Sequence, residues 1–206
     1  MNTATTEKRK RLKREERQAQ ILEVGLRVFA RKGFAATTLD EVAAEAGITK
    51  PIIYDYFENK EAFFDAIAEN EMTLITRRVM NAIDTTSDEP IVEQTLGVFF
   101  QYLQERPDGF RALTSHAPMS WYGNDRRSEL RRAFYAARVE DARRILKAVG
   151  DHETDPGVLA HSIIGSLTFI GEYWLNTDGI PVEQIKKSLA NLIRFGLPTA
   201  GPRSQP

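Results

Sequence analysis

Residues 38–60 of this 206-residue chain read TLDEVAAEAGITKPIIYDYFENK. Thr38 followed three residues later by Glu41 forms a capping box, which marks the start of a helix. Gly47 supplies the left-handed residue at which that helix can end. Pro51 suits the first turn of a following helix, where its missing N–H costs nothing. The stretch therefore predicts two short helices joined by a tight turn, a helix-turn-helix.

Apolar residues at helical spacing continue on both sides of this stretch, and strand-like alternation is absent from the sequence. We expect helices at about 10–32, 38–46, 49–56, 59–83, 91–106, 108–115, 124–149, 156–176 and 181–195. Prolines fall between the later helices, as helix boundaries require. The expected fold class is all-α, with an N-terminal three-helix domain that contains the helix-turn-helix and a second helical domain after it.

The formal net charge of −1 hides an uneven distribution. Residues 1–60 contain 12 Lys/Arg and 9 Asp/Glu, and the remainder contains 16 and 20. A basic N-terminal part favours an anionic partner. We expect a basic arm at 1–17, a helix-turn-helix domain at 18–62, a second domain at 63–198 and a disordered polar tail at 199–206.

The segments ILEVGLRVFARKGFAATTLDEVAAEAGITK and PIIYDYFENKEAFFDAI resemble the TetR family of bacterial transcriptional regulators. The resemblance covers roughly a quarter of the chain. It implies a DNA-binding domain followed by a helical ligand-binding and dimerisation domain. It also implies a cytoplasmic regulator, most often a repressor, that binds a palindromic double-stranded DNA operator as a homodimer and is released by a small effector.

The resemblance suggests a DNA contact for each of Thr38, Thr49, Lys50, Pro51, Ile52, Tyr54, Tyr56 and Lys60. Both threonines are also N-cap candidates. Lys50 can donate to guanine in the major groove or contact a phosphate. The basic run at 8–14 is expected to meet phosphates or enter a minor groove. Asp55 departs from the family pattern, and it can accept from cytosine, pair with a cation or point away from DNA.

Helix 156–176 is apolar nearly all round, so a partner must cover one of its faces. With helix 181–195 it resembles the family's dimer interface. The high aromatic content favours a hydrophobic effector, an acyl chain or an aromatic compound. The candidate pocket residues are Phe99, Leu103, Phe110, Trp121, Phe134 and Trp174. The charges of helix 124–149, Asp141 included, are expected to be solvated. Its expected inner face contains Leu130, Phe134, Ala137, Ala142, Ile145 and Val149.

Other classes of function are weaker. The chain has no cysteine, and it lacks a phosphate-binding glycine loop and a HExxH zinc motif, so we expect neither an enzyme nor a cofactor. The cluster at 151–153 is expected to be solvated charge in a turn. No run of 18 apolar residues occurs, so no membrane span is expected. A transcriptional activator, or a helical interaction module with a degenerate DNA-binding surface, remains the alternative.

Overall fold

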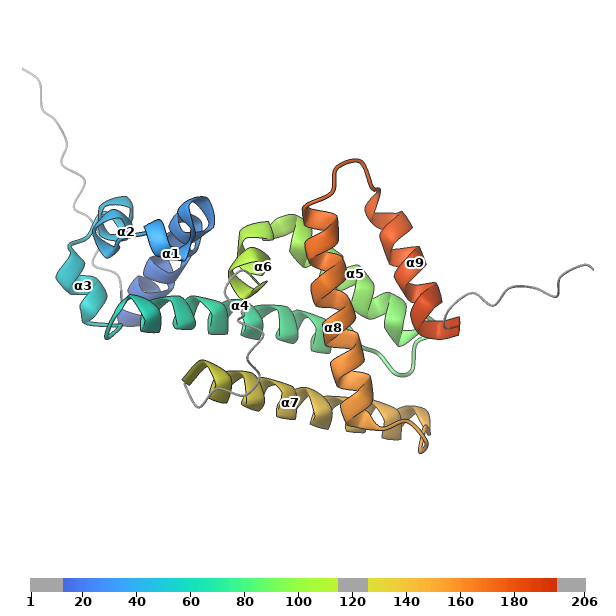
Figure 1. The fold of residues 1–206 in the computed structure, drawn as a ribbon. Coiled ribbons are helices and arrows are strands. Elements are labelled where there is room, and N and C mark those ends of the chain that lie inside the picture. Colours follow the sequence, from blue (N-terminus) through green and yellow to red (C-terminus); the bar gives the residue numbers. More distant parts are fainter. Residues whose placement is uncertain (1–12, 115–125, 196–206) are drawn as a thin grey trace, which may run out of the picture. The chain divides into compact units, whose positions relative to one another are not determined.

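The computed structural model describes residues 13–114 and 126–195, and every regular element in these ranges is an α-helix (Figure 1). The helices are α1 (Arg14–Ala36), α2 (Leu39–Ala46), α3 (Lys50–Tyr54), α4 (Lys60–Ala82), α5 (Ile91–Glu105), α6 (Pro107–Thr114), α7 (Arg126–Val149), α8 (Pro156–Leu175) and α9 (Val182–Phe195). The predicted all-α class is confirmed. The tail at 199–206 lies outside the described residues.

Contacts divide the chain into two compact units, with the boundary inside α4 between Ile67 and Ala68. The first unit contains α1, α2, α3 and the start of α4. The second contains the rest of α4 and α5 to α9. Each unit has its own buried core, and each is described below by itself.

The first unit is held together by apolar side chains from each of its helices. Ile21 of α1, Val42 of α2, Ile53 of α3 and Phe63 of α4 are all fully buried. Aromatic rings add to this core, since Phe29 contacts Phe34, Phe63 and Phe64 with ring centroids 5.0–5.8 Å apart. The short helices α2 and α3 thereby share a core that neither could form alone.

The turn between α2 and α3 forms as the sequence predicts. The Thr38 hydroxyl accepts from the Glu41 N–H at 3.3 Å, and the Glu41 carboxylate accepts from the Thr38 N–H at 3.1 Å. Gly47 ends α2 at φ 65°, ψ 37°, a left-handed conformation that glycine adopts without steric cost. The predicted capping box and glycine stop are both confirmed.

Gly25 of α1 faces the packed rings, and we expect it to tolerate no side chain. A Cβ there would lie 2.2 Å from Phe63 Cζ and 2.9 Å from Ile67 Cδ1. Gly25→Ala should lower the free energy of unfolding by about 1–3 kcal/mol because overpacked atoms must move apart. Gly97→Ala in α5 is the control, since nothing lies within 4 Å of its Cβ position. Urea unfolding should show the control unchanged or stabilised by up to about 1 kcal/mol, and equal losses would contradict the prediction.

In the second unit, α5 supplies the central core. Its residues Leu96, Phe99, Phe100, Tyr102 and Leu103 are buried together with Phe110 of α6 and Leu189 and Ala190 of α9. Trp174 of α8 packs against this cluster, and its indole N–H donates to the Ile180 carbonyl at 3.1 Å. Gly171 of α8 allows close packing, because a Cβ there would lie 2.7 Å from Phe110 Cζ.

A buried polar cluster ties α4 to α5 in the same unit. Glu71 is 1% exposed, and its carboxylate accepts from the Tyr102 hydroxyl at 3.0 Å. It also accepts from Arg106 Nε at 2.9 Å and from an Arg106 terminal nitrogen at 2.6 Å. Burial, followed by the Glu71 charge, raises the pKa of Tyr102, so its hydroxyl remains a donor. We call Glu71, Tyr102 and Arg106 the Glu71 cluster.

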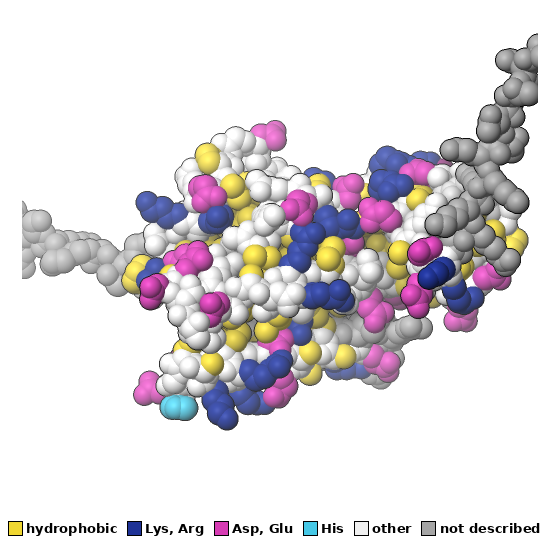
Figure 2. All heavy atoms as spheres, turned by 180° about the vertical axis from the view of Figure 1, so that it is seen from behind, with side chains coloured by type: hydrophobic (Ala, Val, Ile, Leu, Met, Phe, Trp, Pro, Cys, Tyr) yellow, Lys and Arg dark blue, Asp and Glu magenta, His cyan; other side chains and the backbone are white. Residues whose placement is uncertain are grey.

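Charged side chains of both signs are interspersed on the face shown in Figure 2. Helix α7 corrects two expectations, one about a charged side chain and one about the face that packs. Asp141, predicted to be solvated, is buried at 6% exposure and pairs with Arg138 at 2.7 Å and with Arg144. Ala137 and Val149, predicted to face inward, are exposed. Ala142, also predicted to face inward, is buried, and so is Leu146, which was not predicted to be.

Candidate nucleic-acid interface

Helix α3 presents a mixed surface of one cation, one proline and one tyrosine hydroxyl. Pro51 is exposed in its first turn and Tyr54 is 49% exposed, whereas Ile52 is half-buried. Ile53 of α3 and Phe57, which follows the helix, are both buried. A short helix anchored by one face and open on the other can insert into a DNA groove.

The two threonines differ in what their side chains do. Thr38 is exposed and caps α2 through its hydroxyl. Thr49 occupies the N-cap position of α3, but its side chain makes no cap hydrogen bond. The predicted capping role is therefore correct for Thr38 and wrong for the side chain of Thr49, whose backbone alone has the N-cap conformation.

Lys50, the first residue of α3, pairs with a residue that sequence reasoning had not selected. Its Nζ donates to the Asp40 carboxylate at 2.8 Å, and both side chains are exposed, at 40% for Lys50 and 68% for Asp40. The hydrogen bond to Asp40 is the largest cause that raises the pKa of Lys50. Their ten-residue separation across the turn gives no periodic signal, so the pair emerges only from the fold.

Cations also lie at both ends of the segment that follows α3. The Arg14 guanidinium lies 4.7 Å from the centre of the Tyr56 ring and donates to the Asp55 carbonyl at 3.1 Å. Asp55 thus meets a cation, but through its backbone. Lys60 donates to the Ala35 carbonyl at 3.3 Å and lies 4.5 Å from the Phe34 ring centre. Arg14 therefore lies beside Tyr56, a predicted DNA contact. Residues 8–12 of the basic run lie outside the described residues.

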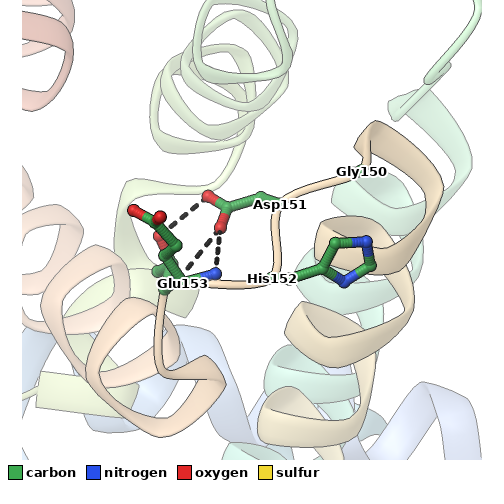
Figure 3. Close-up of a pocket in the computed structure, with 5 residues that line it drawn as sticks. Gly150, Asp151, His152 and Glu153 are labelled. Carbon is green, nitrogen blue, oxygen red and sulfur yellow. Dashed lines mark hydrogen bonds between the residues drawn. The ribbon is translucent and has the colours of Figure 1, made fainter.

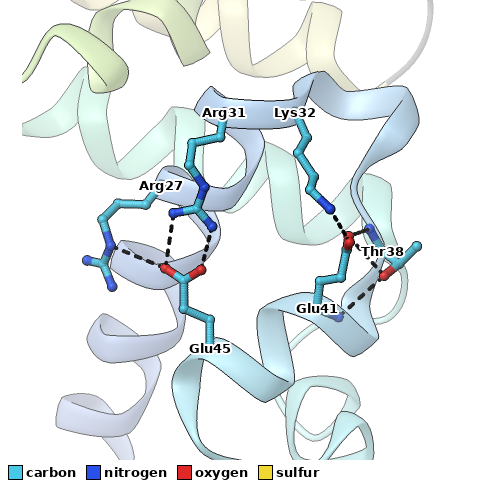
Figure 4. Close-up of polar contacts among 6 residues, drawn as sticks. All are labelled: Arg27, Arg31, Lys32, Thr38, Glu41 and Glu45. Atoms are coloured by element: carbon cyan, nitrogen blue, oxygen red, sulfur yellow. Dashed lines mark hydrogen bonds and ion pairs between the residues drawn. The ribbon is translucent and has the colours of Figure 1, made fainter.

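Further cations of α1 are neutralised within the first unit by α2 (Figure 4). Glu45 pairs with Arg27 at 3.5 Å and with Arg31. Glu41 pairs with Lys32. The hydrogen bond from Lys32 is the largest cause that lowers the pKa of Glu41. The hydrogen bond from Arg31 is the largest cause that lowers the pKa of Glu45. Both carboxylates therefore remain charged at neutral pH.

The predicted effector residues do not all come together. Phe99, Leu103 and Phe110 lie in the α5-centred core, and Trp174 packs against it. Phe134 is half-buried on α7, where it contacts Tyr135 with ring centres 5.5 Å apart. Trp121 lies outside the described residues. Four of the six candidates, three aromatic residues and Leu103, thus lie in or against one hydrophobic cluster.

The loop between α7 and α8 surrounds a shallow polar hollow at residues 150–154 (Figure 3). The Asp151 carboxylate accepts from the backbone N–H groups of Glu153 at 2.9 Å and Thr154 at 3.0 Å. The Thr154 hydroxyl donates to it at 2.8 Å. These bonds, Thr154 first, lower the pKa of Asp151. The carboxylate is used to build the turn, in keeping with the expected turn of solvated charge.

Helix α8 is the one described helix long and apolar enough to cross a membrane by those two measures, and only 11% of the tested window is buried. Three of its large side chains are exposed on one face: Val158 at 64%, Phe169 at 68% and Tyr173 at 51%. They recur at helical spacing, so they form a stripe. We call these three residues the α8 face.

A family model described as "Bacterial regulatory proteins, tetR family" matches residues 21–67. The transcriptional activator FasR of Mycolicibacterium smegmatis is 28% identical over 82% of this chain and 76% of its own. The transcriptional repressor SCO4008 of Streptomyces coelicolor is 31% identical over 48% of each chain. A putative fatty acid metabolism regulator of Clostridium perfringens is structurally similar, with TM-score 0.67 and 25% identity over 88% of this chain and 100% of that one.

Proposed function

Because the chain belongs to the TetR family of bacterial regulatory proteins, we propose that it controls transcription as a homodimer on a palindromic DNA operator and responds to a small hydrophobic effector. It is a helix-turn-helix DNA-binding regulator of transcription. The observation that carries the finer proposal is the exposed surface of α3, fixed by the Gly47 turn and the buried Ile53.

The proposed DNA contacts are those predicted from the sequence. We place phosphate contacts on Thr38, Thr49, Tyr54, Tyr56 and Lys60, a base contact on Lys50, and apolar contacts to thymine methyl groups on Pro51 and Ile52. Hydroxyl and ammonium donors fix the position of a protein on the backbone, whereas base edges supply sequence information. Arg14 joins this set as a positioning residue, since it holds Tyr56 and the end of α3.

We propose that a second copy of the chain covers the α8 face. A stripe of three exposed apolar side chains on a soluble protein marks an interaction site. Leu192 and Phe195 of α9 are also exposed, at 44% and 73%, while Leu189 of the same helix is buried. A two-fold dimer would place two recognition helices on the two halves of a palindrome.

The proposed effector is apolar because aromatic side chains surround its expected site. Phe99, Phe110 and Trp174 bring rings from α5, α6 and α8 together beside Leu103, and a ligand binding there would push these helices apart. Such a ligand acts only through different affinities for two conformations. Whether it releases or recruits the protein distinguishes a repressor from an activator, and we propose repression, acting in the cytoplasm and without enzymatic activity.

Selection of bound duplexes from a random pool tests the proposal. We expect a palindromic consensus with two half-sites whose centres are about 10 base pairs apart, or a multiple of about 10. Binding to it should weaken steeply as salt rises, because phosphate contacts release counterions. Lys50→Ala should weaken binding to the consensus at least about fivefold. Recovery of no palindrome, together with salt-insensitive binding, would support an interaction module instead.

A further inference from the structure

The Asp40–Lys50 pair is exposed at the place where α3 is proposed to meet DNA. Asp40 lies in the first turn of α2 and Lys50 at the start of α3, with 2.8 Å between the Asp40 Oδ2 and the Lys50 Nζ. An ion pair this exposed contributes little to stability. The N-terminus of α2 favours an acidic residue in general, but that preference does not require a lysine beside it.

A carboxylate at a DNA-facing surface is a liability unless it has a DNA partner. Phosphates surround the major groove and repel it, and cytosine N4 is the base-edge donor to which an acidic side chain is suited. Lysine has the opposite preference, since it donates to guanine O6 and N7. Guanine and cytosine are partners in one base pair, so an adjacent ammonium and carboxylate match its edge.

From this match, and resting on the proposed function, we propose that Asp40 and Lys50 act together to read one G·C base pair in each half-site. Lys50 donates to guanine O6 or N7, and Asp40 accepts from the cytosine N4 amino group. Asp40 is thereby a specificity-determining residue. The pair is already assembled without DNA, which lowers the cost of ordering two side chains on binding.

An A·T pair with adenine in the place of guanine should be rejected by the same two residues. The adenine N6 donor then lies where guanine O6 accepts, and the thymine O4 acceptor lies where cytosine N4 donates, so both Lys50 and Asp40 are mismatched. The Asp40 charge then remains unpaired near phosphates, or holds Lys50 away from the DNA. Asp40 should consequently weaken binding to unrelated DNA while it sharpens the choice of sequence, which is specificity achieved by repulsion.

Parallel selections with four full-length proteins test this inference: wild type, Asp40→Asn, Lys50→Gln and Glu45→Gln. Glu45→Gln is the matched control, because it removes the same charge from the same helix at a carboxylate that pairs with Arg27 and Arg31. Affinities are then measured for the wild-type consensus and for a duplex in which adenine replaces the guanine, and thymine the cytosine, of the selected G·C pair. Circular dichroism checks that each variant is folded.

Wild type and Glu45→Gln should prefer G·C at one position per half-site by about tenfold. Asp40→Asn and Lys50→Gln should each lose most of this preference, and Asp40→Asn should bind unrelated DNA more tightly. The inference is overturned if Asp40→Asn binds every duplex more tightly but keeps the G·C preference, or if wild type selects a palindrome without it. Failure of wild type to select any sequence would instead overturn the proposed function.

Discussion

Glu71→Ala is expected to lower the free energy of unfolding by about 3 kcal/mol, because it removes one partner of a buried ion pair and leaves the other. Glu71 is 1% exposed and holds Tyr102 and Arg106 through three hydrogen bonds. The Arg106 side chain is 23% exposed, so without Glu71 its charge would stay largely away from water. The loss should appear in urea unfolding followed by far-ultraviolet circular dichroism.

Two further variants separate the buried charge from other effects of the substitution. Glu69→Ala removes an exposed carboxylate from the same helix and should change the free energy by less than about 0.5 kcal/mol. Tyr102→Phe removes a single hydrogen bond to Glu71 and should cost about 1 kcal/mol. Similar losses for Glu71→Ala and Glu69→Ala would show that the Glu71 cluster adds no more to the free energy of unfolding than an exposed carboxylate does.

The Glu71 cluster also explains why α6 carries a glycine at its contact with α4. A Cβ on Gly109 would lie 2.2 Å from the Glu71 Oε2 and 2.9 Å from the Tyr102 hydroxyl oxygen. Three helices of the second unit therefore meet at one buried carboxylate. Because hydrogen bonds are directional and apolar contacts are not, this cluster restricts how α4, α5 and α6 can pack more tightly than the surrounding leucines do.

Sequence reasoning was most successful where the signal is local. The capping box at Thr38, the left-handed Gly47 and the N-terminal Pro51 each act within one or two turns of chain, and the structure confirms all three. The burial of Ile53 and the exposure of Tyr54 agree with a short helix that packs on one face and is open on the other. Local rules therefore fixed the shape of the candidate interface before any long-range contact was known.

Long-range polar contacts could not be predicted in the same way. Glu71 was not selected, because on a helical pattern an acidic residue is taken to be solvated, and its partners lie 31 and 35 residues away. Asp141 was misplaced for the same reason, since its burial depends on how α7 packs. Asp40 shows the limit for the interface itself, because its pairing with Lys50 depends on the angle of the turn.

The apolar α8 face was predicted only as the need for a partner, and the structure identifies which side chains are left uncovered. Phe169 is the most exposed of them, at 68%. Val149 at the end of α7 is 52% exposed, lies outside the α8 face and offers a matched control. Glutamate at either position adds one charge to an exposed apolar site, so a difference between the two variants reports on the interface.

Phe169→Glu is expected to convert the proposed dimer into a monomer and to weaken binding to the palindromic operator by about 100-fold or more, because two half-sites no longer reinforce one another. A charge buried between two copies of α8 would lack a partner, and the dimer would dissociate rather than bury it. Sedimentation velocity at micromolar protein and operator titration measure the two effects. Val149→Glu should remain dimeric and bind as wild type does. A Phe169→Glu protein that stays dimeric would place the dimer interface elsewhere. A wild type that is already a monomer would overturn the proposed homodimer, and lipid or another protein would then be the partner of the α8 face.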